Sequence, residues 1–117
     1  MTDFHSLYRH GFARVALATP RVRVADPAAN AERILALARQ GSERGAVLVA
    51  FPELALSSYT ADDLFHQDAL DRAVEEGLRA VVHGSSELHC ALVVGAPLRT
   101  EGILFNCALV IHGGRVA

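Results

Sequence analysis

Apolar residues along this chain form short continuous runs, and helical stripes lie between them. Residues 12–19 and 47–51 are two such runs, and the second is five apolar residues without alternation. A run of this kind favours a strand buried on both faces. Between the two runs, Ile34, Leu35 and Ala38 recur at the spacing of one helix face. Strand, helix and strand with short connections predict a βαβ unit with parallel strands and a right-handed crossover.

The crossover helix has clear start and stop signals, which predict that it covers residues 26–44. Asp26 precedes Pro27. An aspartate can cap free N–H groups, and a proline loses no hydrogen bond in the first turn. Gly45 then ends the helix immediately before the second strand. Residues 21–24 alternate and predict a short exposed extension of the first strand, whereas residues 1–11 predict at most one helical turn.

The second half of the chain continues the α/β pattern. A short helix is predicted over residues 61–66, with Thr60 and Asp63 placed as in a capping box. A longer helix capped by Asp68 is predicted to end at Gly84. Buried strands follow at residues 90–97 and 103–112, and Gly113-Gly114 turns the chain towards a fifth strand. We therefore expect an α/β fold with about four strands and two to three helices.

Glu53 is the strongest candidate for chemistry, because it follows the 47–51 run directly. Pro52 ends that strand, since proline has no N–H for the sheet. Open α/β sheets bind ligands beyond the carboxyl ends of their strands. We expect Phe51, Pro52 and Leu54 to desolvate the carboxylate partly, which would suit a general base. The alternative is a solvated loop glutamate.

Composition excludes several functions. The chain has 117 residues, is 51% hydrophobic and carries a net charge of −2. So much apolar surface in a small domain indicates that something outside the sequence covers part of it. The chain has no basic run, so we expect no nucleic-acid partner. It also has no run long enough to span a bilayer and no signal peptide, so we expect no membrane partner and a cytoplasmic location.

The remaining reactive residues give no second site. All basic residues are arginines, so the chain contains no lysine. Cys90 and Cys107 lie in predicted strands and are interpreted as small buried hydrophobic residues. The six histidines lack metal-ligand spacing, and we expect no metal. The sequence also has no G-x-G-x-x-G motif and no phosphate-binding loop.

At this point the motifs resemble a known family. Phe51-Pro-Glu-Leu-Ala-Leu-Ser-Ser-Tyr59, followed by Asp63-Leu64 and Gln67-Asp68-Ala-Leu70, resembles the first catalytic segment of the nitrilase superfamily. The similarity is greatest to the glutaminase domain at the N-terminus of glutamine-dependent NAD⁺ synthetases. Val93-Val-Gly-Ala-Pro97 and Phe105-Asn106 resemble the next two strands of that family.

Two further features bear on this resemblance. The opening Tyr8-Arg-His-Gly-Phe-Ala-Arg-Val-Ala is similar to the actinobacterial type of the enzyme. Ser58 departs from the pattern, because many members have glycine there, and this change indicates a different loop conformation.

The resemblance implies an α-β-β-α sandwich, of which residues 1–117 form the N-terminal part of the glutaminase domain. The rest of that domain and a C-terminal synthetase domain would lie outside this sequence. It also implies a Glu–Lys–Cys triad in which Glu53 is the general base, with the lysine and cysteine outside the chain. Tyr59 falls where the family lines its glutamine pocket, although an aromatic ring packed under the loop is the alternative.

The implied activity is hydrolysis of the glutamine amide to supply ammonia. The glutaminase needs no cofactor, whereas the synthetase domain would use ATP and Mg²⁺ to amidate deamido-NAD⁺. Assembly into a large homo-oligomer such as an octamer is also implied. One alternative is a stand-alone amidase or carbamoylase of the superfamily, and another is a non-catalytic interaction fragment. Without the lysine and the nucleophilic cysteine, the 117 residues alone are predicted to be inactive.

Overall fold

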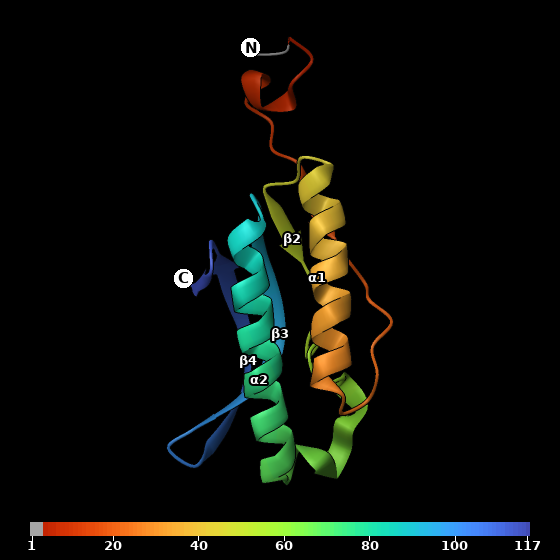
Figure 1. Ribbon diagram of the computed structural model, residues 1–117, viewed down its shortest axis with the longest axis vertical. Helices are drawn as coiled ribbons and strands as arrows, with labels where there is room; N and C mark the ends of the chain where they lie inside the picture. The colour runs from red at the N-terminus through yellow and green to blue at the C-terminus, as the bar shows by residue number, and fades with distance from the viewer. Residues whose placement is uncertain (1–3) are drawn as a thin grey trace.

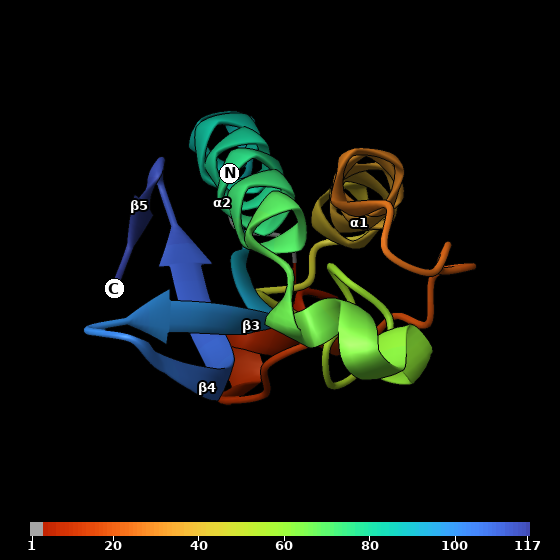
Figure 2. The ribbon, with the colours of Figure 1, turned by 90° about the horizontal axis from the view of Figure 1, so that it is seen from below.

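Two long helices pack side by side on one face of a five-stranded sheet in the computed structural model, which describes residues 4–117 (Figure 1, Figure 2). The strand order follows the sequence; the first three strands are parallel and the last two pairings are antiparallel. The strands are β1 (Val15–Leu17), β2 (Leu48–Ala50), β3 (Ala91–Thr100), β4 (Ile103–His112) and β5 (Arg115–Val116). This arrangement confirms the α/β class and adds the fifth strand.

The predicted βαβ unit is present, and helix α1 (Pro27–Glu43) connects β1 to β2. The Ala29 N–H donates to Asp26 Oδ1 at 3.2 Å, so Asp26 caps this helix as expected. Gly45 follows the C-terminal end with a φ of +78°, a conformation that glycine adopts without strain. The local signals at both ends of the helix were therefore sufficient to place it.

Both parallel strands before the site are shorter than predicted. β1 covers three residues of the 12–19 run, β2 covers three of the 47–51 run, and residues 21–24 form no strand. Val49 is fully buried, whereas Leu48 and Ala50 are only half-buried. Burial of β2 on both faces is therefore wrong for this structure, because helices cover only one face of the sheet (Figure 2).

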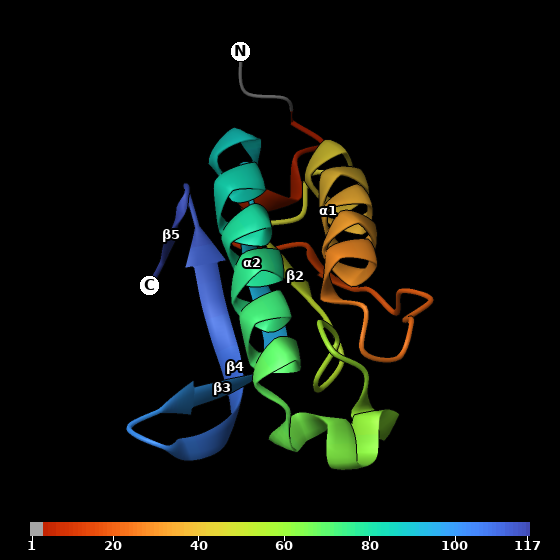
Figure 3. The same ribbon diagram turned by 60° about the horizontal axis from the view of Figure 1, so that its bottom comes forward.

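The second predicted pair of helices is also present, with different caps. Helix α2 (Asp68–Gly84) follows Gln67 without a side-chain cap, so Asp68 is the first helical residue and not the predicted cap. The 3₁₀ helix η2 (Tyr59–His66) begins after Ser58, whose Oγ accepts from the Thr60 N–H at 3.3 Å. Thr60 is thus not the cap either. In Figure 3, η2 lies below the lower ends of α1 and α2.

Two further 3₁₀ helices complete the described elements, η1 (Leu7–His10) and η3 (Ser85–Glu87). η1 lies beyond the upper end of the sheet in Figure 1, and the Tyr8 hydroxyl donates to the Gly45 carbonyl. Tyr8 therefore anchors the N-terminal segment, while Phe4 remains exposed. Within residues 4–117, no helix combines the length and the apolar character needed to cross a bilayer.

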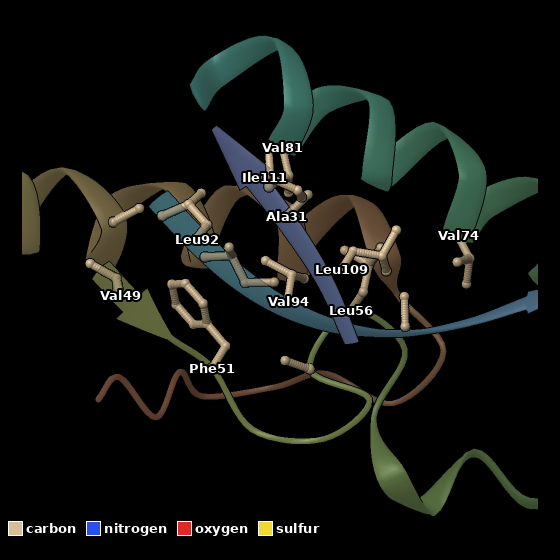
Figure 4. Close-up of a cluster of buried hydrophobic side chains, with 14 of the residues drawn as sticks. Ala31, Val49, Phe51, Leu56, Val74, Val81, Leu92, Val94, Leu109 and Ile111 are labelled. Carbon is tan, nitrogen blue, oxygen red and sulfur yellow. The ribbon is translucent and has the colours of Figure 1, made fainter. Parts of the chain in front are cut away.

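The hydrophobic core lies between the helices and the inner face of the sheet (Figure 4). Strand alternation and register place Val49, Leu92 and Ile111 side by side on this face, all fully buried. Val74 and Val81 of α2 contribute the facing side chains, and Ile34 does so from α1. This core holds β2 and β3 in fixed register, and their carboxyl ends carry the candidate site.

The outer face of the sheet is apolar and has no covering layer. Val15, Leu17 and Val110 are exposed there, and Leu17 is 85% exposed. Burying apolar surface is the main favourable term in folding, so such a continuous apolar face is unusual for a soluble surface. The composition had indicated incomplete cover, and the structure places the uncovered surface on this face.

Candidate active site

Glu53 lies at the tip of a short loop that interrupts the pairing of β2 with β3. The Phe51 N–H donates to the Val93 carbonyl at 3.0 Å, so the parallel pairing extends one residue beyond β2. The chain rejoins β3 at Leu56, whose N–H donates to the Gly95 carbonyl at 3.2 Å. Between these two bonds, residues 52–55 form a tight turn in which Leu54 has a φ of +52°. The prediction that Glu53 lies where this strand ends is confirmed, two residues beyond the last paired residue, Phe51.

Gly95 allows this loop to lie directly on β3. A Cβ atom placed on Gly95 would be 2.4 Å from the Leu54 nitrogen and 2.8 Å from the Pro52 oxygen. The neighbouring Val94 and Ala96 are fully buried towards the helices, so alternation directs Gly95 towards the outer face. The loop therefore crosses β3 on the outer face, and only a residue without a side chain fits beneath it.

Asn106 of β4 is the hydrogen-bond partner of the candidate base. Its Nδ2 donates to Glu53 Oε1 at 2.5 Å, although the two residues are 53 positions apart. The register places Asn106 opposite Pro97 on the same face as Gly95. The pairing of β4 with β3 therefore places the Asn106 amide next to the Glu53 carboxylate.

The Glu53 side chain is exposed, so the expected partial desolvation is wrong for this structure. Of its apolar neighbours, Leu54 lines a separate hollow against η2, and Phe51 is part of the core, as Figure 4 shows. Phe51 and Pro52 also line the hollow beside Glu53, but they leave its side chain open to solvent.

Two hollows meet at Asn106. The first has a volume of about 330 Å³ and is lined by Glu53, Gly95 and Asn106 together with apolar residues and Cys107. The second, about 280 Å³, lies between η2 and the β3–β4 hairpin and includes Asp62 and His66. The first hollow opens on the outer face, so any group that reacts with Glu53 would approach from that side.

Arg99 of β3 forms an ion pair with α2 and a hydrogen bond with η2. Arg99 Nε donates to Asp71 Oδ2 at 2.7 Å, and its Nη2 donates to the Phe65 carbonyl at 3.3 Å. One arginine of β3 therefore ties α2 to η2 and holds the wall of the second hollow. Both partners of the pair are largely shielded from solvent, which makes the contact stronger than a fully exposed pair.

Tyr59 is separated from this arrangement. It is the first residue of η2, and its side chain is 68% exposed. The alternative that it packs under the loop is therefore wrong, and within residues 4–117 it lines neither of the two hollows. The structure does not bring Tyr59 together with Glu53.

The two cysteines have different surroundings. Cys90 lies just before β3 and is fully buried, and burial raises the pKa of its thiol, so it stays protonated near neutral pH. Cys107 is half-buried in β4 and lines the first hollow, but among the described residues its thiol makes no hydrogen bond to Glu53. No group of three potential metal ligands occurs within residues 4–117. The chemistry that the described site can offer is proton transfer by one carboxylate.

Sequence reasoning did not assign roles to Gly95 and Asn106. Both residues belong to the segments that carried the family resemblance, but neither has a reactive side chain. Two signals could have singled them out: a glycine within a buried strand often marks close backbone approach, and Asn106 is a polar residue inside the otherwise apolar run of β4.

The fold and the position of Glu53 define a class of protein. Residues 14–116 match the sequence profile of the family described as "Carbon-nitrogen hydrolase". The chain belongs to the carbon-nitrogen hydrolase family.

Two curated relatives match this chain over nearly its whole length. The glutamine-dependent NAD(+) synthetase of Mycobacterium tuberculosis (strain H37Rv) is 48% identical over 114 residues, and that of Mycobacterium leprae is 43% identical over the same length. Each match covers 97% of this chain but 17% of the relative, so the chain spans about a sixth of the length of these curated relatives.

Solved structures give the same fold. The glutamine-dependent NAD(+) synthetase from Cytophaga hutchinsonii superposes with a TM-score of 0.81 at 23% identity, covering 89% of this chain and 18% of that one. An amidase of the nitrilase superfamily from Nesterenkonia AN1 superposes with a TM-score of 0.79 at 25% identity, covering 90% of this chain and 40% of that one. The expected nitrilase-type fold is confirmed for the portion present.

Proposed function

We propose that this chain provides the general base of a glutamine-hydrolysing site and that Glu53 is that base. The observation that carries the proposal is the placement of Glu53. An exposed carboxylate is held at the end of β2, above Gly95, in a chain 48% identical to a glutamine-dependent NAD(+) synthetase. Carboxylates beyond the carboxyl ends of parallel strands are positioned to meet a ligand.

In the proposed reaction, Glu53 moves protons for groups that this chain does not contain. It accepts the proton of a cysteine thiol, and the thiolate attacks the side-chain amide carbon of glutamine. A lysine stabilises the tetrahedral oxyanion. Glu53 then gives its proton to the amide nitrogen, so that the C–N bond breaks and ammonia leaves, and later deprotonates the water that hydrolyses the thioester. Both the lysine and the cysteine would come from other parts of a longer protein, because this chain has no lysine, Cys90 is buried, and Cys107 packs against the hydrophobic core.

The proposal extends to the organisation of that longer protein. Residues 1–117 would be the N-terminal part of a glutaminase domain, and a second sheet of the sandwich would cover the outer face. Ammonia would pass to a synthetase domain that uses ATP and Mg²⁺ to amidate deamido-NAD⁺, in a cytoplasmic homo-oligomer. Tyr59, exposed here, would reach the glutamine pocket once the domain is complete.

A stand-alone amidase is the second candidate. The similarity to the Nesterenkonia amidase supports it, since that structure superposes about as well as the synthetase structure. The two candidates differ in a measurable way, because a synthetase forms NAD⁺ from deamido-NAD⁺ with ATP and either glutamine or free ammonia. An amidase releases ammonia and forms no NAD⁺.

The test is Glu53→Gln in the longer protein. This change keeps the shape and removes the base, so we expect the glutamine-dependent rate to fall by about 10²-fold or more. The rate with free ammonia should persist, because ammonia bypasses amide hydrolysis. Glu101→Gln, at an exposed acid in the β3–β4 turn, is the matched control and should leave both rates unchanged. Loss of both activities in Glu53→Gln would mean that Glu53 is structural.

A further inference from the structure

The hydrogen bond between Asn106 and Glu53 fixes one of the two carboxylate oxygens. Asn106 Nδ2 donates to Glu53 Oε1 at 2.5 Å. Within residues 4–117, no ion pair involves Glu53 and no other side chain hydrogen-bonds to it. An amide donor has no charge, so it orients the carboxylate without neutralising it. Oε1 accepts this bond, and among the described residues no side chain donates to Oε2.

Both partners are attached to rigid parts of the sheet. The Glu53 backbone is clamped over Gly95 by the bonds at Phe51 and Leu56, and Asn106 lies in the middle of the ten-residue strand β4. A side chain on an exposed loop would ordinarily sample several rotamers, which is costly for a base that must meet a proton in one geometry. The bond from β4 selects one of these orientations.

We propose that Asn106 is the positioning residue for Glu53. Its amide holds Oε1, so that Oε2 faces the hollow and accepts the proton of the attacking thiol. The S–H bond breaks, an O–H bond forms on Oε2, and the electron pair stays on sulfur. This inference rests on the proposed function, because it assigns a role within the same site. It also predicts that the neutrality of the amide matters as much as its shape.

The experiment compares two substitutions of Asn106 in the longer protein. Asn106→Leu keeps the volume and removes the donor, so kcat for glutamine hydrolysis should fall about 10- to 100-fold with little change in KM. Asn106→Asp keeps the shape and adds a second carboxylate beside the first. Two neighbouring carboxylates share a proton, so the acidic limb of the pH–rate profile should move to higher pH. This shift requires the residue at position 106 to lie beside Glu53 in the working enzyme, and the fall in kcat at unchanged KM in Asn106→Leu separates a positioning role from a structural one.

Two controls accompany these variants. Thr100→Asp adds the same charge at the exposed end of the same hairpin and should leave rate and pH profile unchanged. The ammonia-dependent rate and the melting temperature should persist in both Asn106 variants, which together show that the protein is folded. The inference is overturned if Glu53→Gln is inactive with glutamine while both Asn106 variants retain the parent kcat and pH profile. It is also overturned if both variants lose the ammonia-dependent rate as well. If Glu53→Gln itself retains full activity with glutamine, the proposed function fails and this inference fails with it.

Discussion

Ser58 adopts a backbone conformation that normally belongs to glycine. Its φ is +81° and its ψ is 143°, a region that costs a residue with a Cβ atom roughly 1–3 kcal/mol. Its Oγ offsets part of this cost by accepting from the Thr60 N–H and contacting Thr60 Oγ1 at 3.2 Å. Ser58 thus has a positive φ that favours glycine, the residue that many members of the family have here.

This geometry predicts opposite effects for two small substitutions. Ser58→Gly should raise the free energy of unfolding by about 1 kcal/mol, because relief of strain exceeds the loss of one exposed hydrogen bond. Ser58→Ala should lower it by about 0.5–1 kcal/mol, because the Cβ remains and the hydrogen bond is lost. Urea unfolding of the longer protein would measure both changes. A destabilised Ser58→Gly protein would show that the cap outweighs the strain.

At the scale of elements, the site depends on how the loop after β2 crosses β3. The loop crosses over a glycine, and the atoms that would meet a Cβ at Gly95 all belong to the backbone of residues 52–54. Backbone atoms of a clamped loop cannot rotate away as a side chain can. Gly84 offers the contrast, because a Cβ there would meet only the side chain of Leu35, the nearest atom at 2.6 Å.

We therefore expect Gly95→Ala to displace Glu53 and Gly84→Ala to be tolerated. A shift of the loop by even 1 Å would separate the carboxylate from Asn106 and from its reaction partner, and the glutamine-dependent rate should fall about 10²-fold. The ammonia-dependent rate should persist in both variants. Steady-state kinetics with each nitrogen source would measure this. An active Gly95→Ala enzyme would mean that the loop can lift without losing the site.

At the scale of the whole molecule, helices cover one face of the sheet and leave the other face open. Helices α1 and α2 cover the inner face of the sheet, while the outer face exposes Leu17 and Val110 beside the Glu53 hollow (Figure 2). Under the proposed function, the rest of the glutaminase domain packs there and excludes water from the site. Glu53 would then be exposed only in the isolated 117-residue chain.

Lysines introduced on the outer face should have different effects in the 117-residue chain and in the longer protein. In the 117-residue chain, Leu17→Lys combined with Val110→Lys should reduce self-association, because charge replaces exposed apolar surface. In the longer protein the same pair should lower the melting temperature by several degrees, since two charges would be buried without partners. Sedimentation velocity and thermal unfolding would measure the two effects. An unchanged melting temperature would mean that the outer face stays in contact with water.

Short-range sequence signals determined the elements and the position of one candidate residue. The Asp26 cap and Gly45 placed α1, β4 coincides with the predicted 103–112 strand, and Glu53 was placed at the strand end because Pro52 cannot continue a ladder. These features depend on residues within a few positions of one another. The sequence also identified the family through motifs carried by the same segments.

Tertiary structure decided the lengths of β1 and β2, the caps of η2 and α2, and the surroundings of Glu53. Strand length depends on the partner strands, so the apolar runs overestimated it. The carboxylate is exposed although Phe51 and Pro52 line the same hollow, which local sequence cannot reveal. The contact with Asn106 and the crossing over Gly95 join residues about 40 to 50 positions apart, and only the register of β2, β3 and β4 brings them together. The sequence by itself supplied the candidate base, and the packing of the sheet decided which residues hold it and on which face of the sheet its hollow opens.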